Sequence, residues 1–191
     1  VCSYTIGEDS IVLTGFGIQG LYYAAVTFVQ LLEGKNVPCA EILDWPDMEF
    51  RCHKVECRFG TNLMEKQDWM DLIDQLAMQK ISHVQINVYG CWCVQYDGKV
   101  SEYLYVPIEG HPELRTPVYN KYFDAAQGVW VEEEKLPPMY EQDFFGQLVE
   151  YGKARGVKVY AGFNSYGHNT LIPRTNPNVS AKEESGEPTL F

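Results

Sequence analysis

Apolar positions in the second half of the chain repeat one pattern twice: a helical stripe that leads into a short apolar strand. Residues 67–92 form the first copy and residues 140–168 the second, and each strand ends in polar and glycine residues. Parallel strands joined by crossover helices place functional groups at the carboxyl ends of the strands. The loop after the second strand carries His168, so we expect this loop to be functional surface.

Three segments carry helical stripes, residues 19–33, 67–80 and 140–155. Apolar residues at offsets of three, four and seven mark one face of each predicted helix. The first face consists of Leu21, Ala24, Ala25, Phe28, Leu31 and Leu32. The second consists of Trp69, Leu72, Ile73, Leu76 and Ala77. The third consists of Phe144, Phe145, Leu148, Val149 and Ala154. Gly34 and Gly156 follow the first and third helices as predicted C-caps.

Strand patterns lie between these helices. Residues 4–14 predict two strands joined by a turn at residues 7–9. Three further segments each predict one strand: residues 50–59, 83–88 and 157–163. Pro38 and Pro46 make residues 36–49 a predicted linker between two structural units.

Three strands linked by crossover helices predict an α/β fold in which the strands are parallel and adjacent in chain order. The arrangement predicts the first three strands of a (β/α)8 TIM barrel, which takes about 250 residues when complete. We therefore expect this chain to be the front part of a longer protein. Residues 94–139 interrupt the pattern as a long insertion, which its many aromatic residues predict to be ordered. The acidic run at residues 132–134 predicts a solvated loop within it.

Composition narrows the possible partners. Hydrophobic residues make up 46% of the 191 residues, which is enough for a packed core. The formal net charge of −11 disfavours nucleic acid and anionic membrane surfaces as partners. No apolar run approaches the ~20 residues that a membrane-spanning helix requires. Neither oligomeric state nor compartment follows from these features.

The six cysteines do not follow the spacing of a zinc module. Buried free thiols are the simplest interpretation, and a metal site or a redox pair is the alternative. We therefore expect no metal and no cofactor.

Four segments of the chain resemble glycoside hydrolase family 20, the β-N-acetylhexosaminidases. Residues 20–32 resemble the last helix of the small α+β domain that precedes the catalytic barrel in that family. The segment Ile42-Leu-Asp-Trp-Pro-Asp-Met-Glu-Phe-Arg51 resembles the entry into the first barrel strand. Residues 76–81 resemble the end of the first barrel helix, and residues 156–168 resemble the third strand with its Gly-His loop. The resemblance covers nearly the whole chain apart from the insertion.

The resemblance implies a domain organisation and a reaction. Residues 1–45 would be the C-terminal part of a small α+β, zincin-like domain and its linker. Residues 46–191 would be the N-terminal part of the barrel. In the family, the 2-acetamido oxygen of the substrate attacks its own anomeric carbon, and an Asp-Glu pair after the fourth strand assists. We expect that pair to lie outside this chain, which would then contain no catalytic residue. The expected partner is a glycan with a terminal N-acetylated amino sugar.

Two candidate substrate-binding residues follow from the resemblance. Arg51 stands where a family arginine hydrogen-bonds sugar hydroxyls, a role that suits the fixed donors of a guanidinium. An ion pair with Glu56 or Asp47 at the edge of the core is the alternative for Arg51. His168 matches a loop histidine that supports the acid/base glutamate, and a structural histidine bonded to the backbone is the alternative.

Four further candidates lie at the ends of the second and third strands: Asn87, Tyr89, Trp92 and Asn164. Tyr89 and Trp92 could stack on a sugar ring or belong to the core.

The chain also departs from the family pattern. The second strand carries Asn87 and Gly90 near the positions of the usual His and Asp, and Glu56 stands where an Asp is usual. The third strand reads Ala161-Gly-Phe-Asn164 in place of Pro-Glu-Ile-Asp. A related glycan-cleaving barrel and a non-catalytic carbohydrate-binding relative therefore remain as alternatives.

Overall fold

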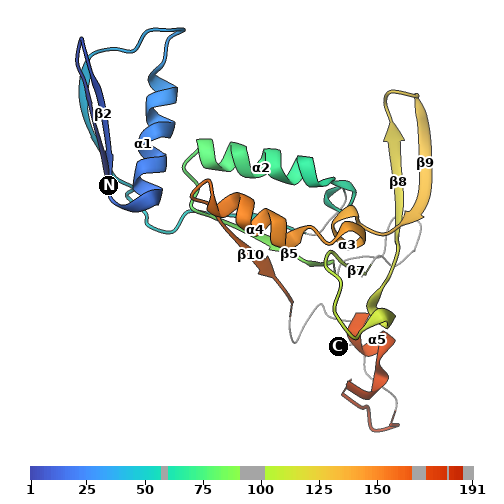
Figure 1. Cartoon of the computed structure of the whole chain (residues 1–191). Coiled ribbons are helices and arrows are strands. Elements are labelled where there is room, and N and C mark those ends of the chain that lie inside the picture. The colour runs from blue at the N-terminus through green and yellow to red at the C-terminus, as the bar shows by residue number, and fades with distance from the viewer. Residues whose placement is uncertain (57–59, 91–101, 165–170, 180, 187–191) are drawn as a thin grey trace. The chain divides into compact units, whose positions relative to one another are not determined.

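The structure is a computed structural model that describes residues 1–56, 60–90, 102–164, 171–179 and 181–186 (Figure 1). The chain divides into two compact units, each built from three segments. Unit one consists of Val1–His53, Met70–Val84 and Leu148–Tyr160. Unit two consists of Lys54–Trp69, Gln85–Gln147 and Ala161–Phe191. Several strands and helices pass from one unit into the other.

Unit one begins with a small antiparallel sheet in the order β2-β1-β3. Its strands are β1 (Cys2–Ile6), β2 (Ile11–Gly15) and β3 (Ala40–Asp44). The hairpin of β1 and β2 confirms the two predicted strands. The predicted linker at residues 36–49 is wrong at its centre, because β3 pairs with β1 along its whole length. The sheet order places β3 at an edge. Its residues alternate between half-buried and exposed, and two of them are acidic, so the sequence of β3 does not show the apolar run of a central strand.

Helix α1 (Gly17–Leu31) packs on this sheet (Figure 1). Its buried residues are Gly20, Tyr23, Ala24 and Val26. The predicted face is therefore wrong by about one position, and Leu21 and Leu32 are exposed. The reason lies at the helix start, where the Cα of Gly15 lies directly against the backbone of Gly20 and Leu21. This close approach turns the Gly20 side of the helix toward the sheet.

The C-terminal end of α1 also differs from the prediction. Helix α1 ends at Leu31, and Gly34 lies beyond it in a turn with a φ of 67°. Within the core of unit one, the hydroxyl of Tyr4 donates to the carbonyl of Tyr23 at 3.3 Å. Burial raises the pKa of Tyr4 to about 12, so this hydroxyl remains a donor across the ordinary pH range.

A second sheet has the strand order β10-β5-β4. Its strands are β4 (Cys52–Val55), β5 (His83–Asn87) and β10 (Lys158–Gly162). This order confirms that the three predicted strands are neighbours in chain order.

Backbone hydrogen bonds give the direction of β5 and β10. The carbonyl of Ser82 accepts from the amide of Lys158 at 2.9 Å, and the carbonyl of Gly162 accepts from the amide of Val88 at 2.9 Å. Partner positions rise together along both strands, so β5 and β10 are parallel as predicted.

The same holds for β4 and β5. The carbonyl of Arg51 accepts from the amide of His83 at 3.0 Å before the strands, and the side chains of Glu56 and Asn87 meet where the strands end. The fold is thus α/β, with a parallel sheet whose strands end on the same side.

Helix α2 (Lys66–Met78) precedes β5, and helix α4 (Phe145–Lys153) precedes β10. The two helices lie side by side (Figure 1), and within unit one Tyr151 of α4 donates to Asp74 of α2 at 2.8 Å. The predicted stripe of α2 is confirmed by the burial of Trp69, Ile73, Leu76 and Ala77. A left-handed residue follows each helix within three positions, Lys80 with a φ of 57° after α2 and Gly156 with a φ of 71° after α4. The following amide donates to the carbonyl five positions back, which confirms the predicted cap at Gly156.

The single helix predicted at residues 140–155 is wrong. The structure has α3 (Pro138–Gln142) and α4, with Asp143 between them at a φ of 48°. A left-handed residue breaks the helical hydrogen-bond ladder, and the break buries Phe144. Ala154, which the stripe placed inside, is exposed.

The two faces of the parallel sheet differ in polarity. One face carries buried apolar residues: Val84, Ile86, Val157 and Val159. The other face carries polar or charged residues on all three strands: Lys54, Gln85, Asn87 and Lys158. The polar face and the carboxyl ends of the strands therefore position the candidate site.

Unit two also contains the described part of the insertion and the C-terminal elements. The short strands β6 (Tyr89–Gly90) and β7 (Tyr103–Leu104) pair antiparallel. A hairpin follows, formed by β8 (Val118–Asp124) and β9 (Val129–Lys135). The remaining elements are the 3₁₀ turns Thr61–Leu63, Pro112–Leu114 and Pro177–Val179, and the short helix α5 (Leu171–Thr175). Order within residues 102–139 agrees with the predicted ordered insertion.

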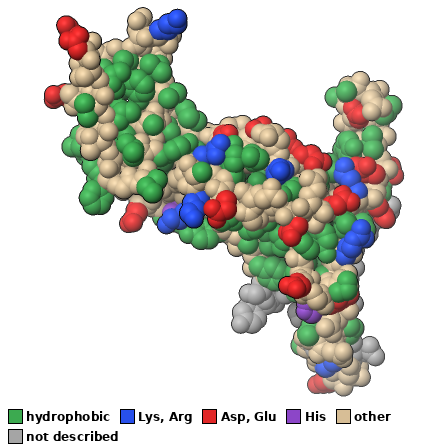
Figure 2. Space-filling model, viewed as in Figure 1, with side chains coloured by type: hydrophobic (Ala, Val, Ile, Leu, Met, Phe, Trp, Pro, Cys, Tyr) green, Lys and Arg blue, Asp and Glu red, His purple; other side chains and the backbone are tan. Residues whose placement is uncertain are grey.

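The acidic run at residues 132–134 is not in a loop as predicted, because it lies in β9. Cross-strand pairs explain how a charged segment forms a strand. Glu132 pairs with Lys121 at 2.6 Å, and Phe123 lies against Trp130 with ring centroids 5.7 Å apart. Figure 2 shows acidic, basic and hydrophobic side chains interspersed along this hairpin.

Candidate functional site at the strand ends

Asn87 is the last residue of β5 and connects two strand ends. Its side-chain amide donates to Oε2 of Glu56, just past β4, at 2.6 Å. The oxygen of the same amide accepts from Gln85 at 3.3 Å. Asn87 is only 5% exposed, so its polar atoms are directed toward these neighbours.

Glu56 is more accessible than Asn87. Its side chain is 48% exposed, and Oε1 forms an ion pair with Nζ of Lys54 at 2.6 Å. At the strand end the carboxylate is thus held on one side by an amide and on the other by an ammonium group. Glu56 was noted in the sequence only because it replaces the usual Asp of the family pattern and because it was a possible ion-pair partner of Arg51.

Gly162, the last residue of β10, is required by this arrangement. A Cβ at this position would collide with Oδ1 of Asn87 and would lie 2.5 Å from Nε2 of Gln85. The amide side chains of β5 therefore occupy the space that any larger residue on β10 would need. The role of this glycine could not be predicted from the sequence, because it depends on which residues of β5 lie beside it in the strand register.

Tyr89 is a core residue. Its side chain is 1% exposed, its hydroxyl accepts from the amide of Leu171 at 2.8 Å, and its ring lies 5.3 Å from that of Phe163. The core alternative considered for Tyr89 therefore describes its position, because a buried ring presents no face to a sugar. Asn164 follows Phe163 and is half-buried at the end of β10. His168 and Trp92 lie outside the described residues, so their predicted contacts stay predictions.

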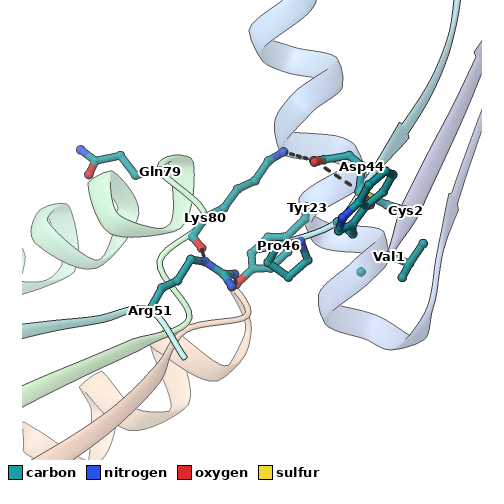
Figure 3. Close-up of a pocket in the computed structure, with 10 residues that line it drawn as sticks. Val1, Cys2, Tyr23, Asp44, Pro46, Arg51, Gln79 and Lys80 are labelled. Carbon is teal, nitrogen blue, oxygen red and sulfur yellow. Dashed lines mark hydrogen bonds and ion pairs between the residues drawn. The ribbon is translucent and has the colours of Figure 1, made fainter. Parts of the chain in front are cut away.

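Arg51 lies in unit one, immediately before β4 (Figure 3). Its Nε donates to the carbonyl of Lys80 at 2.9 Å, and its Nη1 donates to the carbonyl of Met48 at 2.5 Å. Its Nη2 donates to the hydroxyl of Tyr23 at 3.3 Å. All three guanidinium nitrogens thus donate to protein oxygens, and neither Glu56 nor Asp47 is among these partners.

The environment of Arg51 is a cavity of about 230 Å³ that Asp44 and Lys80 also line. Figure 3 shows Lys80 reaching Asp44, and the ion pair measures 2.6 Å. Arg51 precedes β4 and so stands before its strand, whereas Asn87 closes the parallel strand β5 and stands at the end of its own strand.

Within the described residues, no group of three or more His, Cys, Asp or Glu side chains is arranged to hold a metal ion. No helix in the described part of the chain is long and apolar enough to cross a bilayer.

Solved structures share this arrangement. An exo-β-N-acetylglucosaminidase of glycoside hydrolase family 20 (GH20) from Vibrio harveyi matches 96% of this chain with a TM-score of 0.71 and 16% sequence identity. A β-hexosaminidase from Streptomyces plicatus matches 100% of the chain with a TM-score of 0.70 and 14% identity. A β-N-acetylhexosaminidase from Bacteroides fragilis matches 94% with a TM-score of 0.69 and 17% identity.

The chain has the fold of part of a GH20 enzyme. It covers 28%, 36% and 34% of the lengths of these three structures, respectively. No protein-family model matches the chain, and no curated protein sequence does. The likeness to GH20 is therefore carried by the fold, and it confirms at that level the resemblance noted in the sequence.

The direction of the parallel strands indicates which end of the sheet to consider. In α/β folds with parallel strands, ligands bind at the carboxyl ends of the strands. Glu56, Asn87 and Asn164 lie at those ends in this chain, and together they offer one carboxylate and two amides. Such groups donate to and accept from hydroxyl and acetamido groups, and by themselves they lack a second carboxylate for acid/base chemistry.

Proposed function

We propose that this chain is the N-terminal part of a glycoside hydrolase of the β-N-acetylhexosaminidase type. The whole protein would hydrolyse terminal N-acetylated amino sugars from a glycan, with the acetamido group of the substrate as the nucleophile. The observation that carries the proposal is the fold, since almost all of the chain superposes on about one third of several GH20 enzymes.

The proposal includes a division of the chain. Residues 1–45 would close a small α+β, zincin-like domain, and residues 46–191 would supply the first three strands of a TIM barrel. The parallel order of β4, β5 and β10 supports the barrel assignment, because strands that are adjacent in the chain are adjacent around a barrel. The small sheet with α1 packed on it supports the assignment of the first domain.

In this proposal Asn87 and Asn164 belong to the sugar-binding end of the barrel. Amide side chains suit hydroxyl and acetamido groups because each amide offers both donors and an acceptor. The contacts of Arg51 with three protein oxygens support a structural role for that residue rather than sugar contact.

The test is hydrolysis of a chromogenic N-acetyl-β-glucosaminide by the whole protein. The matched control substrate is the β-glucoside with the same leaving group, which lacks the acetamido nucleophile. We expect turnover of the first and at least a hundredfold slower turnover of the second, because an acetamido group held beside the anomeric carbon acts at a high effective concentration.

Other outcomes would contradict the proposal. Equal hydrolysis of both substrates would indicate a glycosidase that supplies its own nucleophile. Binding of N-acetylglucosamine without turnover would indicate a carbohydrate-binding protein.

A further inference from the structure

We propose that Glu56 is a sugar-binding residue of this site and that Asn87 is a positioning residue for its carboxylate. The inference deepens the proposed function and rests on it for the identity of the ligand. Its geometric part, the fixed carboxylate, stands on contacts within unit two alone.

Glu56 has the accessibility that a binding residue needs. The side chain of Glu56 is 48% exposed, whereas its partner Asn87 is only 5% exposed. Only Glu56 of this pair can therefore reach a ligand in solvent. Its place directly after β4 is the carboxyl end of a parallel strand, where ligands bind in folds of this kind.

Asn87 holds the carboxylate in one orientation. An ionised carboxylate can only accept, so the NH₂ end of the Asn87 amide faces Glu56 at 2.6 Å, and the amide oxygen accepts from Gln85 at 3.3 Å. The missing side chain of Gly162 gives the Asn87 amide the space it occupies. Strands β4, β5 and β10 thus all contribute to fixing one carboxylate, and a carboxylate fixed before binding loses less entropy when a ligand arrives.

The chemistry of the pair identifies the ligand class. A carboxylate accepts hydrogen bonds from hydroxyl and amide N–H groups, both of which an N-acetylated amino sugar carries. Lys54 on the other side offsets part of the negative charge, so a neutral sugar meets no strong local field.

The first test measures catalysis by the whole protein carrying Glu56→Gln or Asn87→Ala. Each substitution should raise KM for the N-acetylglucosaminide about tenfold, because a hydrogen bond to a charged group is lost or misdirected. The kcat should change less than threefold, since neither residue supplies a proton. Glu134→Gln on the exposed face of β9 is the matched control and should leave KM unchanged.

The second test needs no activity. In Asn87→Asp, two carboxyl groups would lie at hydrogen-bond distance, and such a pair holds one proton to a higher pH than an isolated carboxyl group. The variant should therefore be less thermostable than the wild type at pH 8 and should recover most of the difference at pH 4.5. An equal difference at both pH values would overturn the fixed pair.

Direct titration with N-acetylglucosamine separates the two proposals. Loss of binding in Glu56→Gln together with an inactive wild type would refute the hydrolase and support the role of Glu56. An active protein whose Glu56→Gln variant keeps the wild-type KM would support the hydrolase and overturn the role of Glu56. A wild type that neither hydrolyses nor binds would overturn both.

Discussion

His83 illustrates how one residue at the start of β5 makes the fold sensitive to pH. Its ring stacks on Tyr160 with centroids 5.7 Å apart, lies 4.5 Å from the ring of Phe50, and bonds the hydroxyl of Ser82 at 2.6 Å. Burial lowers the pKa of His83 below its ordinary value of 6.5, and the positive charges of Lys158 and Arg51 lower it further. The neutral imidazole is therefore the form that the folded protein favours.

The consequence is a loss of stability in acid. Below pH 6.5 the unfolded chain takes up the proton more readily than the folded one, so the free energy of unfolding falls as the pH drops. In His83→Gln this part of the pH dependence should disappear. Urea unfolding at pH 8 and pH 5.5 measures it, with His53→Gln at an exposed position as the control. An identical pH dependence in wild type and His83→Gln would show that the ring titrates as it does in the unfolded chain.

At the scale of elements, helix α4 contains two glycines in opposite environments. A Cβ on Gly146 would meet nothing within 4 Å, whereas a Cβ on Gly152 would lie 2.7 Å from the carbonyl oxygen of Val157 and 2.7 Å from a methyl group of Val159. Gly152 thus allows the chain to turn back closely from the helix into β10. Gly146 only costs helix propensity.

The same substitution should therefore have opposite signs at the two sites. Gly146→Ala should raise the free energy of unfolding by about 0.5–1 kcal/mol, the propensity difference between the two residues. Gly152→Ala should lower it by about 1–3 kcal/mol, because the new methyl group meets backbone and a packed side chain. Chemical denaturation of both variants measures this. Equal effects would mean that α4 and β10 are farther apart than the structure has them.

The sequence predicts elements well where a strong stripe coincides with burial, as in α2, β5 and β10. It fails where tertiary contacts decide. The edge strand β3 has no apolar run, and the break at Asp143 depends on the burial of Phe144. The turn between β8 and β9 could have been predicted from Asp124 and Gly128, residue types that are typical of turns. In the structure the side chain of Asp124 accepts from two amides of this turn, and Gly128 has a φ of 69°.

The candidate site shows the same limit. The strand-end rule led to Asn87, which does close β5, whereas Arg51 was proposed from the family resemblance and precedes β4, which begins at Cys52. The predicted strand ran from residue 50 to residue 59, whereas β4 ends at Val55, so the prediction placed Glu56 inside the strand and not at its carboxyl end. With the observed end of β4, the strand-end rule leads to Glu56. Only the strand register shows why Gly162 is needed beside Asn87.

At the scale of the whole molecule, charge and polarity agree with a neutral sugar as the ligand. The net charge of −11 opposes binding of anionic polymers. The polar face of the parallel sheet carries both signs of charge together with amides. Both features support a glycan partner.

The chain alone should nevertheless be inactive. Among the described residues that directly follow β4, β5 and β10, Glu56 is the only one with a carboxylate side chain. Cleavage of a glycosidic bond needs a general acid that protonates the leaving oxygen. It also needs, on the other side of the sugar, either a second carboxylate or the acetamido group of the substrate, which a second carboxylate holds in place. The 191-residue chain should therefore show no hydrolysis of a chromogenic N-acetyl-β-glucosaminide above buffer, whereas the proposed function requires hydrolysis by the whole protein. Turnover by the pure chain that is abolished by Glu56→Gln would show that the acid/base group lies within these residues.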